Sequence, residues 1–143
     1  MKYLKLFENF EDIGKINESW FRKPFIKIKC EKYGIKNYTI NPDGSIDVDG
    51  DVYLSQRGLT KLPLKFNHVS GHFKCSRNKL TTLEGSPKSV GGHFWCYNNK
   101  LTTLEECPQS VGGAFDCIGN KILTFEGAPN HVGAFYCSGN PIQ

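Results

Sequence analysis

A motif of about 21 residues recurs along most of this chain of 143 residues, and this repetition limits the possible folds more than any other feature. Four copies align on a cysteine and read FKCSRNKL from Phe73, FWCYNNKL from Phe94, FDCIGNKI from Phe115 and FYCSGNPI from Phe135. A degenerate fifth copy precedes them, with apolar residues 21 positions before those of the first full copy, at Val52, Leu54, Leu59 and Leu62. Sequence periods in this range indicate a solenoid.

Each copy predicts one strand that is buried on one face. Phe94 and Cys96 alternate with polar or aromatic residues, which is typical of a half-buried strand. Leu101 and Leu104 then return to the core, and the Gly91–Gly92 pair predicts the tight turn that leads into the next strand. Stacked coils would place equivalent strands about 4.8 Å apart in a parallel sheet, so that like residues form columns.

An asparagine stands three residues after each cysteine of the four full copies, at Asn78, Asn99, Asn120 and Asn140. An amide side chain at the bend after a strand can satisfy backbone groups of its own coil and of the adjacent one. The residue before each asparagine is of a type that tolerates positive φ, most clearly Gly119 and Gly139, which predicts a turn there.

The pattern F-x-C-x-x-N-x-L-x-x-L resembles the leucine-rich repeat consensus L-x-x-L-x-L-x-x-N-x-L, with Phe and Cys in two leucine positions. The short period and the prolines at Pro87, Pro108 and Pro129 make it similar to the short bacterial-type repeats. The LEGSPKSVGG linker and the MKYLKLFENF start also resemble small repeat proteins of tailed bacteriophages. The resemblance implies an α/β fold, a short leucine-rich-repeat solenoid with a parallel sheet whose concave face binds protein.

The N-terminal third predicts a cap for one end of this solenoid. Residues 2–12 suggest a short amphipathic helix, and Pro24 followed by FIKIKCEKYG predicts a second helix that ends before Gly34, although the alternation in FIKIKC also fits a strand. The turn sequence Asn41–Gly44 between two alternating runs predicts a β-hairpin. We therefore expect a helix and hairpin cap over residues 1–49 and the solenoid over residues 50–143, forming one compact unit.

Residues that flank the buried Phe and Cys should point to the opposite face of the sheet. Exposed aromatic and aliphatic side chains on a rigid sheet are the types that anchor interfaces. The alternative is that they pack on one another or beneath the N-terminal segment. The predicted protein-binding residues are Tyr53, His72, Lys74, His93, Trp95, Tyr97, Asp116, Ile118 and Tyr136.

The sequence predicts no enzyme, cofactor or metal site. The cysteine column cannot wrap one tetrahedral ion, and each thiol stands where a small apolar residue belongs. Cys75 and His72 project from opposite faces of a strand, which excludes a shared proton. DVDGD at residues 47–51 lacks the glycine and glutamate spacing of a calcium loop. Glutamates 84, 105 and 126 form a like-charged, solvated column.

The charge distribution and the ends of the chain suggest alternative partners. Residues 1–40 hold nine Lys or Arg against five acids, so nucleic-acid binding would use this segment, but the pI of 8.7 makes it the less favoured reading. The apolar Ile142 near the end of the last coil suggests a homodimer through that end. No apolar run is long enough for a membrane span, and with no secretory signal we expect a cytoplasmic protein with reduced thiols, in the host cytoplasm if phage-encoded. The start also resembles leader segments of phage capsid proteins.

Overall fold

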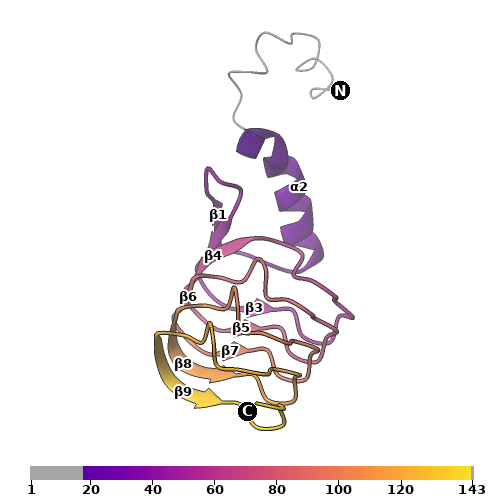
Figure 1. The fold of residues 1–143 in the computed structure, drawn as a ribbon. Helices are drawn as coiled ribbons and strands as arrows, with labels where there is room; N and C mark the ends of the chain where they lie inside the picture. Colours follow the sequence, from indigo (N-terminus) through magenta and orange to yellow (C-terminus); the bar gives the residue numbers. More distant parts are fainter. Residues whose placement is uncertain (1–17, 143) are drawn as a thin grey trace.

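The computed structural model describes residues 18–142, which form a β-solenoid with one helix. The coils follow one another at the spacing of about 21 residues that the repeat predicts, because Phe73 pairs with Phe94 and Phe94 with Phe115 in parallel register. Figure 1 shows the coils stacked along one axis, with α2 at one end and β9 at the other. The predicted register of columns is therefore confirmed.

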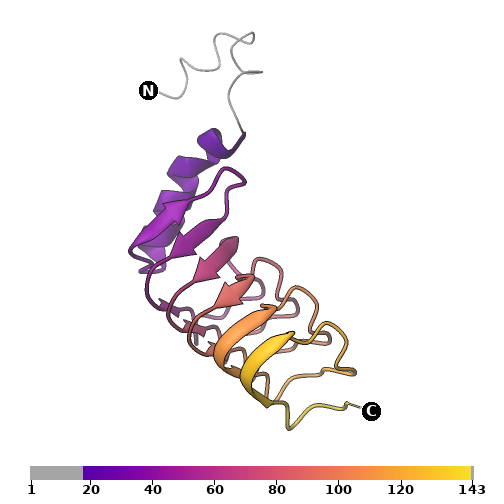
Figure 2. The same ribbon diagram turned by 90° about the vertical axis from the view of Figure 1, so that its left-hand side faces the viewer.

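Each full coil contributes strands to two rows of one nine-stranded sheet. The first row holds β2 (Ile46–Val48), β4 (Phe66–Val69), β6 (Ser89–Val90) and the first parts of β8 (Ser110–Asp116) and β9 (His131–Tyr136). The second row holds β3 (Val52–Tyr53), β5 (Phe73–Lys74), β7 (Phe94–Trp95) and the second parts of β8 and β9. Figure 2 faces the first row.

The sequence predicts one strand per coil, whereas in the structure each coil also contributes a strand, or the first part of one, to the first row. Val90 is buried and pairs with Val69 and Val111, so the segment before the glycine pair is itself a strand. Each first-row strand has at most two or three apolar residues among polar ones. Such a short segment shows too little alternation to be recognised as a strand in the sequence.

The glycine pair forms the corner between the two rows because neighbouring coils approach closely there. A Cβ atom at Gly91 would lie 2.2 Å from the carbonyl oxygen of Ser70, and one at Gly92 would lie 2.4 Å from Nδ1 of His72. The backbone ladder continues through the corner, since Gly92 donates to the carbonyl of Gly71 at 2.9 Å. Only glycine fits at this spacing.

A column of phenyl rings and a column of thiols fill the core. Neighbouring rings of Phe73, Phe94, Phe115 and Phe135 are stacked at centroid distances of 5.3, 5.2 and 5.4 Å. Cys75, Cys96 and Cys117 are fully buried beside them, and all six cysteines are free thiols. The predicted packing role of the cysteine column is confirmed.

The asparagine column joins the coils at the bend after each second-row strand. Asn99 donates through Nδ2 to the carbonyls of Cys75 and Cys96 at 3.1 and 3.0 Å, and its Oδ1 accepts the Leu80 N–H at 3.0 Å. The preceding Asn98 has φ 55°, as the predicted turn requires. Asn78, Asn120 and Asn140 make equivalent bonds.

The helix and hairpin precede the coils. Helix α2 (Glu18–Lys32) ends in a Schellman motif, in which Gly34 has φ 66° and Ile35 donates to the carbonyl of Cys30 at 2.8 Å. Strands β1 (Tyr38–Ile40) and β2 form the predicted antiparallel hairpin, and β2 also pairs in parallel with β4. The first coil of the sheet therefore begins inside the segment assigned to the cap.

The helix predicted for FIKIKC is confirmed, and the alternative of a strand is excluded. The position of Pro24 needs correction, because it lies inside the helix and not in its first turn. A proline in a helix interior costs about 3 kcal/mol, which is why the sequence favoured a start at Pro24. Packing outweighs this cost, because Ile26 and Cys30, one turn apart, are buried in the core. The helix predicted at residues 2–12 lies outside the described residues.

Candidate protein-binding face

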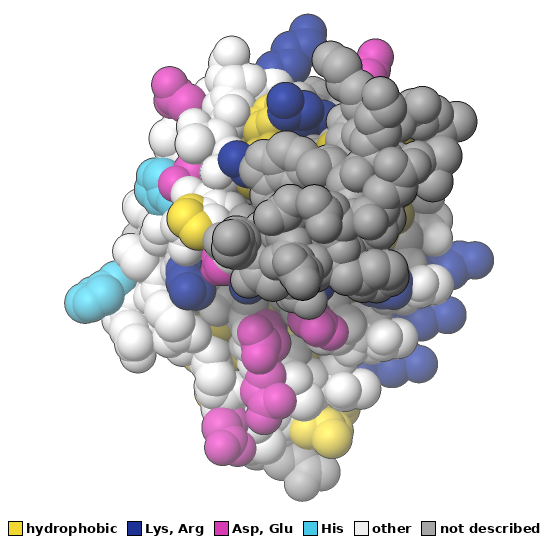
Figure 3. Space-filling model, turned by 90° about the horizontal axis from the view of Figure 1, so that it is seen from above, with side chains coloured by type: hydrophobic (Ala, Val, Ile, Leu, Met, Phe, Trp, Pro, Cys, Tyr) yellow, Lys and Arg dark blue, Asp and Glu magenta, His cyan; other side chains and the backbone are white. Residues whose placement is uncertain are grey.

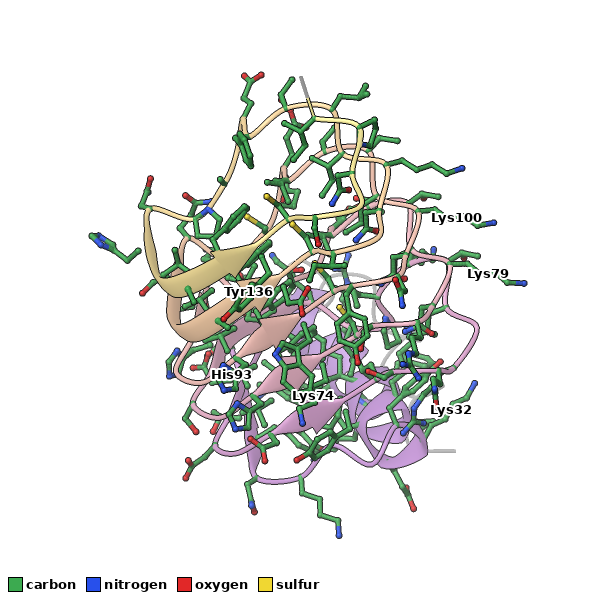
Figure 4. All side chains as sticks on the ribbon, turned by 90° about the horizontal axis from the view of Figure 1, so that it is seen from below. Lys32, Lys74, Lys79, His93, Lys100 and Tyr136 are labelled. Atoms are coloured by element: carbon green, nitrogen blue, oxygen red, sulfur yellow. The ribbon has the colours of Figure 1, made fainter. Side chains whose placement is uncertain are left out.

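The second-row strands carry the candidate site on the side opposite the core. We call this surface the outer face, and it comprises the side chains that flank the buried Phe and Cys of each coil. Figure 4 shows Lys74, His93 and Tyr136 on this side of the stack, whereas Lys32, Lys79 and Lys100 project from another edge. Eight of the nine predicted binding residues lie next to a buried core residue, and Tyr136 lies between the partly buried Phe135 and Cys137, so the strand pattern places all nine on this face.

A lysine held between two aromatic rings organises the first half of the outer face. The Nζ atom of Lys74 lies 5.2 Å from the ring centroid of Tyr53 and 4.3 Å from that of Trp95. Both distances are within the range of cation–π attraction. These contacts follow from the register, because Lys74 is the neighbour of Tyr53 on one side and of Trp95 on the other.

Asp51 fixes the Tyr53 hydroxyl beside this cluster. The Tyr53 hydroxyl donates to Oδ2 of Asp51 at 3.0 Å, and the His72 N–H donates to Oδ1 at 2.7 Å. The hydrogen bond from the His72 N–H, followed by that from Tyr53, holds the pKa of the Asp51 carboxyl below its usual range. The same carboxylate raises the pKa of Tyr53, so the phenol remains a donor.

Trp95 and Tyr97 pack partly on their neighbours. Their ring centroids lie 6.2 Å apart, and the guanidinium of Arg77 lies 5.9 Å from the Tyr97 centroid. Both aromatic side chains are half-buried, whereas Tyr53 and Tyr136 are 54% and 51% exposed. At the centre of the face the aromatic side chains therefore pack partly on one another, as in the alternative considered above. Tyr53 and Tyr136, at its two ends, remain accessible to a partner.

The two histidines serve the sheet as well as its surface. Their rings are stacked at 4.8 Å, and Nδ1 of His72 accepts the His93 N–H at 2.9 Å. Nδ1 of His93 accepts the Ala114 N–H at 2.8 Å. One coil earlier, Oδ1 of Asp51 accepts the His72 N–H in the same way. Only the half-buried rings, and not Nδ1, are therefore left for contact with a partner.

The second half of the face holds Asp116, Ile118 and Tyr136. Asp116 and Ile118 are half-buried, and Oδ1 of Asp116 accepts the Ile118 N–H at 3.0 Å. Asp116 is paired with Trp95 on one side and with Tyr136 on the other. Ser76, although it points to the same side, is 2% exposed and bonds to Ser55 Oγ at 3.0 Å, so it contributes no accessible surface.

The thiols lie on the other side of these strands. Burial raises the pKa of Cys75 and Cys96, and it raises that of Cys117 to about 12. These groups are protonated at neutral pH and cannot act as nucleophiles. The described residues contain no group of three or more His, Cys, Asp or Glu side chains arranged to hold a metal ion.

Sequence reasoning missed a groove that lies away from the outer face. It has a volume of about 1250 Å³, and none of the nine predicted binding residues lines it. Helix α2 contributes Arg22, Phe25, Ile26 and Lys29 to one wall, and the segment from Lys61 to Phe66 contributes to the other. The spacing of the four helical residues indicates that they share one face of the helix, and this was the only sign of the groove in the sequence. The other wall could not be predicted, because the sequence does not show which segment lies beside the helix.

A row of basic side chains and a group of acidic ones lie on separate edges of the stack. Figure 3, seen from the α2 end, shows the basic row on the right and the acidic group below the centre, with further side chains of both charges elsewhere in the view. Lysines 79, 100 and 121 and glutamates 84, 105 and 126 are all exposed, which confirms the solvated glutamate column. The exposed lysines of α2 do not join the outer face, since they lie on the helix at the end of the stack.

Within residues 18–142, α2 is neither long nor apolar enough to cross a membrane. Searches against protein-family models, curated proteins and solved structures found no match to this chain, so the outer face is interpreted from its own geometry.

Proposed function

We propose that this protein is a non-enzymatic module that binds another protein on the outer face of its solenoid. The observation that carries the proposal is the row of aromatic side chains on a rigid sheet, with Tyr53 and Tyr136 about half exposed. Tyrosine and tryptophan supply large contact areas with little loss of conformational freedom, and they are enriched at the energetic centres of interfaces. Lys74 and Asp116 add directional charge.

The resemblance to short leucine-rich repeats supports the same proposal, because in that family the sheet face is concave and binds protein. In this reading α2 and the hairpin cap one end of the solenoid, as terminal units of repeat proteins do. The resemblance to repeat proteins of tailed phages adds that the partner is a host or phage protein in the host cytoplasm.

Capture of a partner from a lysate of the native host, analysed by mass spectrometry, tests the proposal. The double variant Trp95→Ala and Tyr136→Ala is expected to lose a protein that the wild type captures. Its melting temperature should fall only modestly, because Tyr136 is exposed and Trp95, although it contacts Lys74 and Tyr97, lies outside the core. Phe25→Ala is the control, since Phe25 is an exposed aromatic residue on α2 that does not belong to the outer face.

Unchanged capture by the double variant would reject the outer face as the binding surface. Loss of capture by Phe25→Ala alone would instead assign binding to the groove beside α2.

A second candidate function is self-association through the edge of β9. Phe135, Cys137 and Ile142 are only partly buried, whereas Phe115, Cys117 and Ile122 in the preceding coil are fully buried. Phe125 is 52% exposed and meets Phe135 edge-on at 5.9 Å. Exposed apolar surface beside a strand edge that none of residues 18–142 covers favours pairing with another strand. A monomer mass by light scattering at high concentration would reject this candidate.

A further inference from the structure

The middle column of the outer face alternates aromatic and charged residues from coil to coil. Each residue pairs in register with the next, so consecutive side chains are about one strand spacing of 4.8 Å apart. The order along the stack is Tyr53, Lys74, Trp95, Asp116 and Tyr136. The column therefore contains two equivalent positions between aromatic rings, one occupied by a cation and one by an anion.

The first position shows which group suits the space between two rings. Lys74 places its ammonium 5.2 Å from the Tyr53 centroid and 4.3 Å from the Trp95 centroid. The protein thus satisfies this position with its own cation, and the Asp51 carboxylate stands at the Tyr53 hydroxyl.

The second position has an aromatic residue on each neighbouring coil and a carboxylate between them, but no cation from the described residues. Asp116 stands between Trp95 and Tyr136, and one carboxylate oxygen accepts the Ile118 N–H. No lysine or arginine within residues 18–142 forms an ion pair with Asp116 or lies over the Tyr136 ring. Tyr136 is 51% exposed, so a side chain can approach from solvent.

We infer that the position between Trp95 and Tyr136 binds a cationic side chain, an arginine in particular, of the partner protein. A guanidinium pairs with a carboxylate through two parallel hydrogen bonds and stacks on aromatic faces, so it uses Asp116 and the rings together. The inference rests on the proposed function and specifies its partner as a segment that carries a basic residue.

An NMR titration with the full chain tests this assignment. The probe is the peptide acetyl-Gly-Ser-Arg-Ser-Gly-amide, and its control carries citrulline, which has the shape of arginine without the charge. The arginine peptide is expected to shift the amide signals of Asp116, Ile118 and Tyr136 and the indole N–H of Trp95. The citrulline peptide is expected to leave them in place. Equal shifts with both peptides would overturn the assignment.

Asp116→Asn provides the decisive variant, because its side-chain oxygen can still accept the Ile118 N–H while the charge is removed. Affinity for the arginine peptide should fall about fivefold, as expected for one partly exposed ion pair. Glu126→Gln removes the same charge from the edge of the stack and should have no effect. If capture of the natural partner needs Trp95 and Tyr136 but is indifferent to Asp116→Asn, this assignment fails and the proposed function stands.

Discussion

The buried asparagine column makes a quantitative prediction about stability. Asn99 is 7% exposed, and its side chain satisfies two carbonyls and one N–H of the backbone. In the variant Asn99→Ala the buried Leu80 N–H loses its partner, whereas the carbonyls of Cys75 and Cys96 each keep one bond, from Nδ2 of Asn78 and of Asn120 respectively. We expect this single substitution to be among the most destabilising in the chain.

The magnitude follows from the three bonds. A hydrogen bond contributes about 1 kcal/mol net, and leaving a buried polar group unsatisfied costs about 1–3 kcal/mol. One orphaned N–H and two carbonyls that each lose one of their two bonds should therefore lower the free energy of unfolding of Asn99→Ala by about 2–4 kcal/mol. Asn140 makes equivalent bonds but is only partly buried, so water can replace its amide and Asn140→Ala should cost less.

Urea unfolding followed by circular dichroism measures these differences. Asn98→Gly is the adjacent control, since Asn98 is exposed at φ 55° and the equivalent positions 119 and 139 are glycine. It should leave stability unchanged or slightly raised. A loss below about 1 kcal/mol for Asn99→Ala, or an equal loss for Asn140→Ala, would refute the reasoning that burial of the backbone groups determines the cost.

Three further predictions concern pH, thiols and packing. The pKa of the Asp51 carboxyl is lowered on folding, so its contribution to stability is complete above the unfolded value of about 3.9 and is lost as the pH falls through the lower folded value. Asp51→Asn should therefore flatten the acid side of a curve of unfolding free energy against pH. An unchanged curve would contradict the role of the carboxylate. Burial raises the pKa of Cys107 and Cys117 to about 12 and also raises that of Cys75 and Cys96. Native protein at pH 8 should therefore react with iodoacetamide first at the partly exposed Cys137. If mass spectrometry found Cys75 or Cys96 modified equally fast, a buried thiol column would be excluded. Gly112→Ala would place a Cβ atom 2.2 Å from the carbonyl oxygen of Gly91. The variant should lower the free energy of unfolding, measured by thermal denaturation, by about 1–3 kcal/mol. An unaltered melting curve would show that the coils are not in such close contact.

The repeat alone was sufficient to predict the stacking of the coils. Phe94, Cys96 and Leu101 recur with a fixed spacing, and a buried column requires that spacing, so sequence period and coil length must agree. The asparagine role could be predicted for the same reason, because a bend with several orphan backbone groups needs an amide.

Features that depend on contacts between dissimilar segments could not be predicted. The strand at Ser89–Val90 has too few residues for a pattern, and the start of α2 depends on burial of Ile26 and Cys30 against the sheet. Within the site, the pattern placed Lys74 and Trp95 on one face. It did not show that the lysine lies between two rings, or that Nδ1 of His72 is used by the backbone.

A nuclear Overhauser spectrum of protein carrying ¹³C-labelled phenylalanine rings would test the stacking of the coils most directly. The account predicts contacts between the rings of Phe73 and Phe94, of Phe94 and Phe115, and of Phe115 and Phe135, whose centroids are 5.2–5.4 Å apart. If these rings showed no mutual contacts in folded protein, the coils would not be in register and the outer face would not exist as a continuous surface.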